Sequence, residues 1–151
     1  MNDLSPYEFD QSDSGWRLLD AQGKYLEAAK TIENYISLNT DSINVQNEVS
    51  LQTIYFHAGQ EYAMAGPDHY DKAIHNLKKS FKSKAGWDIY VNGTIAFLGQ
   101  DKNDLQKASD KLSVLANADP RLKNNALLLA NFLQALNDNS SYATIYNKTA
   151  R

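Results

Sequence analysis

The residues of this chain best suited to proton transfer or metal binding are its three histidines, His57, His69 and His75. No two of them are four residues apart, the spacing that places two metal ligands on one face of a helix. Cysteine is absent, which excludes disulfides, thiolate metal sites and a cysteine nucleophile. We interpret His57 as a hydrogen-bonded residue between helices, and we predict neither a metal site nor a cofactor.

Motifs of known catalytic sites are missing as well. The sequence has no glycine-rich loop of the phosphate-binding type and no nucleophile elbow. Asp101, Asn103 and Asp104 are spaced somewhat like calcium ligands, but the glycine and the terminal glutamate of a calcium-binding loop are missing. We therefore predict no catalytic residue and a protein that is not an enzyme.

A stripe of basic residues is the strongest charge pattern in the sequence. Lys72, His75, Lys79 and Lys82 lie at positions i, i+3, i+7 and i+10 of a predicted helix, so they would share one face. This basic stripe could meet an acidic partner or a nucleic-acid backbone. It has no arginine and no interleaved aromatic residue, which specific nucleic-acid surfaces tend to use. We favour a solvated outer helix face, and nucleic-acid binding is the alternative.

The composition is that of one soluble domain. The chain has 151 residues and a net charge of −3, and a core of ordinary size is expected at this length. Its first residues are polar and acidic, without the basic start and apolar run of a secretory signal. The longest apolar run, residues 126–130, is far too short to span a membrane. We predict a cytoplasmic protein that does not bind membranes.

Apolar residues recur with helical spacing, and strand-like alternation is scarce. Ser5 and Glu8 form the pattern of a capping box, residues 39–42 predict a loop, and a long helix is expected from about Val45 to Ala65. The predicted organisation is a single helical domain at 1–151, with a short acidic N-terminal segment at 1–13, a degenerate first hairpin at 14–38, a second hairpin at 45–84, a third at 86–118 and a C-terminal capping hairpin at 120–151. The N-terminal segment is either a partner-facing arm or a polar cap.

Small residues recur with a period near 34 residues. Gly59 and Gly93 are 34 residues apart, and Ala73 and Ala108 are 35 apart. Glycine inside a helix costs about 1 kcal/mol relative to alanine. A cost that repeats at a fixed period indicates that a neighbouring helix lies close to each glycine, and such a period is typical of stacked helical hairpins.

The residues around these glycines resemble the signature of the tetratricopeptide repeat. The second hairpin carries the matching residues Tyr55, Gly59, Tyr62, Tyr70, Ala73 and Leu77. The third hairpin carries Gly93, Ala108, Leu112 and the pair Asp119-Pro120. The resemblance covers about residues 14–137. It implies an all-α, tetratricopeptide-like α-α superhelix of three to four antiparallel helical hairpins.

In that family the leading helix of each hairpin lines a concave surface that binds a protein or peptide. The resemblance therefore implies a partner-binding surface formed by Phe56, Gln60, Met64, Trp87, Tyr90, Thr94 and Asn131. Family members that grip a terminal carboxylate hold lysine and asparagine where this chain has Phe56, Tyr90 and Leu127, so no such clamp is implied. Substituting Trp87 or Tyr90 with alanine should weaken binding without unfolding the chain. Alternatively, these aromatic residues pack between hairpins as core.

Together these patterns predict a non-catalytic protein-binding scaffold or adaptor. A narrower form of this prediction is an immunity-type or regulatory protein, because a short, slightly acidic, cysteine-free helical domain suits that role. The alternative is a nucleic-acid-associated regulator that uses the lysines of residues 72–84. The sequence leaves open the identity of the partner and the oligomeric state, including self-association through exposed aromatic residues.

Overall fold

A computed structural model describes residues 1–150 of the chain. Throughout these residues the regular structure is helical and no strand occurs, which confirms the predicted all-α class. The chain divides into two compact units, Met1–Ser80 and Phe81–Arg151. Across residues 1–150, none of the helices combines the length and the apolar character needed to cross a bilayer.

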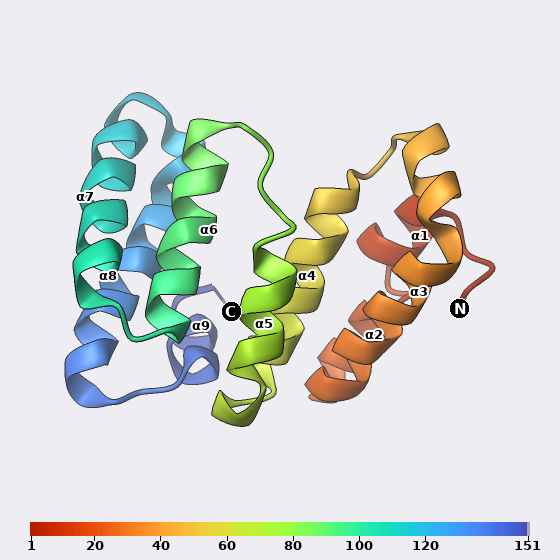
Figure 1. The fold of residues 1–151 in the computed structure, drawn as a ribbon, viewed down its shortest axis with the longest axis horizontal. Coiled ribbons are helices and arrows are strands. Elements are labelled where there is room, and N and C mark those ends of the chain that lie inside the picture. Colours follow the sequence, from red (N-terminus) through yellow and green to blue (C-terminus); the bar gives the residue numbers. More distant parts are fainter. Residues whose placement is uncertain (151) are drawn as a thin grey trace. The chain divides into compact units, whose positions relative to one another are not determined.

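The first unit is built from three long helical segments preceded by two short ones. Helix α3 packs against α4, and α4 packs against α5, in the red-to-green half of the chain (Figure 1). A 3₁₀ turn at Pro67–His69 leads from α4 into α5. The helices are α1 (Pro6–Gln11), α2 (Arg17–Ala21), α3 (Tyr25–Gln46), α4 (Leu51–Met64) and α5 (Tyr70–Leu77).

Helix α3 is longer than the sequence predicted, and the prediction of a loop at residues 39–42 is wrong. The helix bends at Asn39, whose backbone leaves the helical region, and then continues to Gln46. The side chain of Asn39 donates to the carbonyl of Tyr35, and Thr40 donates to the carbonyl of Ile36. These polar side chains bond to the preceding turn without ending the helix. The helix ends instead at Asn47, which adopts the left-handed conformation.

The N-terminal segment is part of the core of the first unit. The predicted capping box is confirmed, because Ser5 accepts from the backbone of Glu8 and Glu8 accepts from that of Ser5. The ring of Phe9 stacks on that of Tyr35 with centroids 3.7 Å apart. The Tyr35 hydroxyl donates to the carbonyl of Leu4 over 2.7 Å. Side-chain packing thus fastens residues 4–9 to α3.

Residues 81–150 of the second unit form four α-helices. Helix α6 packs against both α7 and α8, and α9 packs against α8 (Figure 1). A 3₁₀ turn at Pro120–Leu122 leads into α8. Stacked rings of Phe97 and Phe132, with centroids 4.5 Å apart, join α6 to α8. The helices are α6 (Ala85–Leu98), α7 (Lys102–Ala118), α8 (Lys123–Asp138) and α9 (Tyr142–Ala150).

The two periodic glycines lie where neighbouring helices approach closely. A Cβ atom on Gly59 would lie 2.7 Å from Leu77 Cγ and 3.0 Å from the carbonyl oxygen of Ala73. A Cβ atom on Gly93 would lie 2.6 Å from Leu129 Cδ2 and 3.2 Å from Ala108 Cβ. The close approach predicted from the glycine and alanine spacing is confirmed in both units.

Helix α5 is shorter than its sequence pattern indicated. It ends at Leu77, whereas the predicted helix extended to Lys82. The hydroxyl of Ser80 donates to the carbonyl of Leu77, and the backbone N–H of Ser80 bonds to the same carbonyl. These bonds satisfy the Leu77 carbonyl, which has no partner within the helix. Lys79 and Lys82 therefore lie beyond the helix on which the sequence placed them.

Candidate functional site

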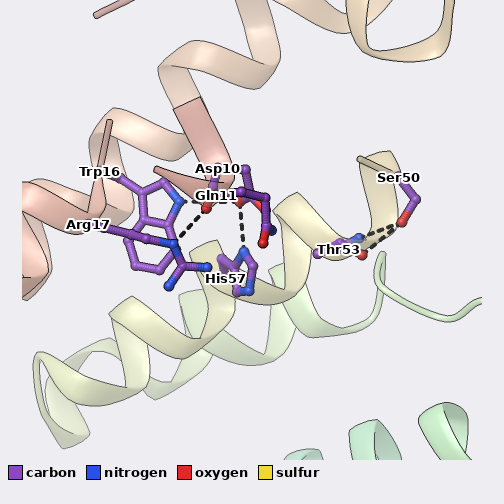
Figure 2. A network of polar contacts seen from close by, with 7 residues as sticks. All are labelled: Asp10, Gln11, Trp16, Arg17, Ser50, Thr53 and His57. Atoms are coloured by element: carbon purple, nitrogen blue, oxygen red, sulfur yellow. Dashed lines mark hydrogen bonds and ion pairs between the residues drawn. The ribbon is translucent and has the colours of Figure 1, made fainter. Parts of the chain in front are cut away.

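A buried carboxylate is the centre of a polar cluster in the first unit (Figure 2). Asp10 is fully buried. Its Oδ1 atom lies 2.7 Å from Nδ1 of His57 and accepts from Nε1 of Trp16 over 3.2 Å. Its Oδ2 atom accepts from Nε2 of Gln11, and its backbone carbonyl accepts from Nε of Arg17 over 2.7 Å. We call these five residues the Asp10 cluster.

Local structure positions each member of the Asp10 cluster. Capped helix α1 presents Asp10 on its inner side. The turn that follows passes so close to α1 that a Cβ atom on Gly15 would lie 2.0 Å from the carbonyl oxygen of Phe9. This tight return brings Trp16 back over Asp10. His57 comes from α4, whose first turn is capped by the Ser50 hydroxyl, an acceptor for the N–H of Thr53 (Figure 2).

The electrostatics of the cluster favour the ionised form of Asp10. Burial raises the pKa of this carboxyl group, but hydrogen bonds from His57, Gln11 and Trp16 and the attraction of the His57 ring outweigh burial and lower it overall. The contact with Asp10 uses Nδ1 of His57, and Nε2, the second ring nitrogen, takes no part in it. Because its neighbours all donate to Asp10, we interpret the cluster as a structural link between α1 and α4. The prediction that His57 bonds between helices is confirmed.

A second polar cluster ties α3, α4 and α5 together. Glu33 accepts from the Tyr62 hydroxyl over 2.6 Å and from the Asn76 side chain over 3.0 Å. Burial and the neighbouring Glu33 carboxylate raise the pKa of Tyr62. The Asn76 amide also donates to the carbonyl of Lys72. Each helix contributes one side chain, so the cluster fixes the register of the three helices.

Three of the seven predicted partner-binding residues belong to α4 in the first unit. Phe56, Gln60 and Met64 are spaced four residues apart and are 6%, 8% and 4% exposed. Their helical spacing places them on one side of α4. Their burial favours the alternative reading for Phe56, in which the aromatic ring packs as core. Whether a partner reaches these residues stays a prediction.

The other four predicted partner-binding residues belong to the second unit. Tyr90 and Thr94 on α6 are buried, and the Thr94 hydroxyl donates to the Tyr90 carbonyl over 2.9 Å. Burial raises the pKa of the Tyr90 hydroxyl. Trp87 and Asn131 are partly exposed, and the Asn131 side chain donates to the Thr149 hydroxyl over 2.8 Å. Trp87 is thus the accessible aromatic residue of the set.

Three lysines of the basic stripe each contact a different aromatic ring. Lys72 Nζ lies 5.5 Å from the ring centroid of Tyr62, and Lys79 Nζ lies 5.0 Å from that of Tyr55. In the second unit, Lys82 Nζ lies 3.9 Å from the ring centroid of Trp87. An ammonium group over an aromatic face gains about 0.5–1 kcal/mol at an exposed site. These contacts favour a role of the three lysines in covering aromatic side chains.

Charge is distributed unevenly between the two units. Residues 1–80 contain 12 acidic residues and 6 lysines or arginines, a balance of −6, whereas residues 81–151 contain 6 and 9, a balance of +3. Residues 31–71 include six acidic residues and no lysine or arginine. The mild net charge of the whole chain therefore hides an acidic first unit.

Over residues 1–150, no group of three or more histidine, aspartate or glutamate side chains is placed to hold a metal ion. Nothing in the sequence distinguishes Asp10 from the other acidic residues of segment 1–13. No local pattern signals its pairing with His57, because the two residues are 47 positions apart.

Comparison of the chain with protein-family models, with curated proteins and with solved structures finds no match. The resemblance to the tetratricopeptide repeat therefore depends on the residues of this chain alone.

Proposed function

We propose that this chain is a non-catalytic scaffold that binds a basic partner protein. The single observation that carries the proposal is the acidic character of the first unit, with its balance of −6. Opposite charges on two proteins accelerate their encounter and select against wrong partners. The Asp10 cluster does not suggest a catalytic role, because the carboxylate is fully buried and its oxygens accept from Gln11, Trp16 and His57.

We also propose that the helical hairpins are a divergent form of the tetratricopeptide repeat. The glycine and alanine contacts between α4 and α5, and between α6 and α7, support this relationship. Consecutive packed helices form a rigid support for surface residues, which is how repeat proteins of this kind hold partners. Partly exposed Trp87 would then be the aromatic anchor of the second unit, covered by Lys82 until a partner replaces that contact.

Neutralisation of a basic toxic protein, as immunity proteins perform it, is the narrower form of the proposal. It is supported by the acidity of the first unit. Neighbouring genes provide a direct check, since an adjacent gene for a basic toxin would support the role and its absence would remove this narrower form.

Binding to nucleic acid through the basic stripe is less well supported. Lys72, Lys79 and Lys82 each lie over an aromatic ring, and residues 1–80 would repel phosphates. Because such binding depends on released counterions, it should be strongest at low salt. We expect no retention of the chain on DNA or RNA columns at low salt, and retention there would favour the alternative.

Affinity capture under native conditions tests the proposed function. The full chain is the bait, and the captured protein is then produced separately, purified and mixed with the chain. We expect a complex with a protein of net positive charge, formed in the absence of nucleic acid. Capture that disappears after nuclease treatment, or an acidic protein as the only reproducible partner, would contradict the proposal.

A further inference from the structure

The second half of α3 exposes two large apolar side chains. Leu38 is 63% exposed and Val45 is 83% exposed. They are seven residues apart, which is about two helical turns. Ile36 and Ile43 have the same separation and are both buried, so the helical periodicity continues through the bend at Asn39. Leu38 and Val45 therefore share the side of α3 that faces solvent.

Small or polar side chains surround these two residues on the same side of the helix. We define the α3 outer face as Asn34, Leu38, Asp41, Ser42 and Val45, all of which are exposed. A single exposed apolar residue is ordinary on a protein surface. Leu38 and Val45 occupy positions i and i+7, two of the anchor positions through which a helix contacts a partner.

The charges around this face determine which kind of partner can bind there. Asp41 lies between the two apolar residues, and Glu48 follows the end of the helix. Lysine and arginine do not occur between residues 31 and 71. Anionic lipids and phosphate backbones would therefore be repelled. An amphipathic helix with an apolar stripe and flanking lysines or arginines is the complementary surface.

We propose that the α3 outer face docks a basic amphipathic helix of a partner protein. This inference rests on the proposed scaffold function and names the part of the first unit that makes contact. Leu38 and Val45 supply the apolar contact, while Asp41 and Glu48 pair with basic residues at the edges of the partner helix. The sequence predicted a loop at residues 39–42. Because α3 instead continues beyond Asn39, the α3 outer face is long enough to carry both Leu38 and Val45.

Titration of the isotope-labelled full chain with synthetic helical peptides tests the proposal. The probe is a leucine–lysine peptide of about 18 residues, long enough to form an amphipathic helix, with its leucines at helical spacing. A leucine–glutamate peptide of the same pattern and a scrambled leucine–lysine peptide are the peptide controls. The variant is Leu38→Ser with Val45→Ser, and its matched control is Val114→Ser with Leu127→Ser, which changes two exposed residues of the second unit.

We expect the leucine–lysine peptide to shift the amide resonances around Leu38, Asp41 and Val45. The variant at these positions should bind at least about tenfold more weakly, a change of about 1.4 kcal/mol, while the control variant keeps its affinity. Absence of binding, shifts that map elsewhere, equal losses in both variants, or equal binding of the leucine–glutamate or scrambled peptide would overturn the proposal. A dimer of the chain that the Leu38→Ser, Val45→Ser variant abolishes would overturn it as well, because the occupant would be a second copy.

The captured partner separates failure of this site from failure of the function. If the purified partner binds the Leu38→Ser, Val45→Ser variant as tightly as the original chain, the docking face is wrong and the scaffold function stands. If no protein partner binds the original chain in any form, the scaffold function falls together with the site.

Discussion

Nδ1 of His57 lies 2.7 Å from Oδ1 of Asp10, which joins the first helix of the chain to α4 across 47 positions of sequence. His57 is 14% exposed at its side chain and Asp10 is fully buried. The pair therefore connects the N-terminal segment to the body of the first unit. It adds a polar link between α1 and α4 to the packing of Phe9 on Tyr35.

Removal of His57 should destabilise the first unit. In the variant His57→Ala, the buried Asp10 carboxylate loses one of its donors, and we expect the free energy of unfolding to fall by about 2 kcal/mol. Urea denaturation followed by circular dichroism measures the loss. His75→Ala is the matched control, because His75 is an exposed histidine on α5, and it should change stability by less than about 0.5 kcal/mol. Equal stability of the two variants would show that the Asp10 pair contributes little.

Stability should fall as the solution becomes acidic. The pKa of Asp10 is below its ordinary value in the folded chain, mainly because bonds from His57 and its neighbours outweigh the effect of burial. The stabilisation is therefore present above the unfolded pKa of about 4 and is lost as the pH falls through the folded pKa. Urea midpoints between about pH 6 and pH 2 measure this change.

The variant Asp10→Asn is the control for this pH dependence. It keeps an oxygen acceptor for His57 but cannot titrate, so its stability should decline less steeply in acid. Glu8 and Asp119 also have lowered pKa values, from bonds to Ser5 and Arg121 respectively, and they remain in both proteins. Identical acid profiles for the two proteins would contradict the role given to Asp10.

Adding one methyl group at Gly59 should weaken the packing of α4 on α5. The new Cβ would lie 2.7 Å from Leu77 Cγ and 3.0 Å from a backbone oxygen of Ala73. We expect Gly59→Ala to cost about 2 kcal/mol, since the overlap outweighs the gain of about 1 kcal/mol in helix propensity. Gly99→Ala is the control, because its Cβ would make only ordinary contacts, 3.4 Å from the Ile95 carbonyl oxygen and 3.9 Å from that of Ala96. A stabilised Gly59→Ala protein would refute the close approach.

Burial changes what we expect from alanine at Tyr90. The side chain is 4% exposed, so Tyr90→Ala should lower the free energy of unfolding by about 3–5 kcal/mol. Trp87 is partly exposed, and Trp87→Ala should cost less stability while it weakens partner binding. Thermal unfolding of both variants distinguishes them. If Trp87→Ala loses more stability than Tyr90→Ala, Trp87 is a core residue and is not the binding anchor.

The helical class and the glycine contacts could be predicted because they follow from local spacing. Gly59 and Gly93 recur with the period of the hairpins, and glycine inside a helix is informative wherever it repeats. Helix ends were predicted less well. The polar residues Asn39 and Thr40 resemble a turn in sequence, yet their side chains bond to the previous helical turn and the helix continues.

The candidate site was less accessible to sequence reasoning because it depends on which segments meet. In the sequence, Asp10 is one of several acidic residues. Only the tertiary structure shows that it lies beneath Trp16 and His57. Phe56 and Tyr90 have the residue type of binding anchors, but their burial follows from the helices packed around them. The acidic character of the first unit became visible only when the structure divided the chain at Ser80.

Calorimetric titration of the purified chain with its captured partner tests most directly whether the first unit is the binding surface for a basic protein. The titration compares about 0.05 M with about 0.3 M salt. It includes the variant Asp41→Lys with Glu48→Lys and the control Asp110→Lys with Asp138→Lys, all at exposed positions. We expect salt and the first-unit variant each to weaken binding by about tenfold or more, while the second-unit control binds normally. An affinity that does not respond to salt would contradict the proposed function, whereas equal losses in the two variants would contradict only the docking face on α3.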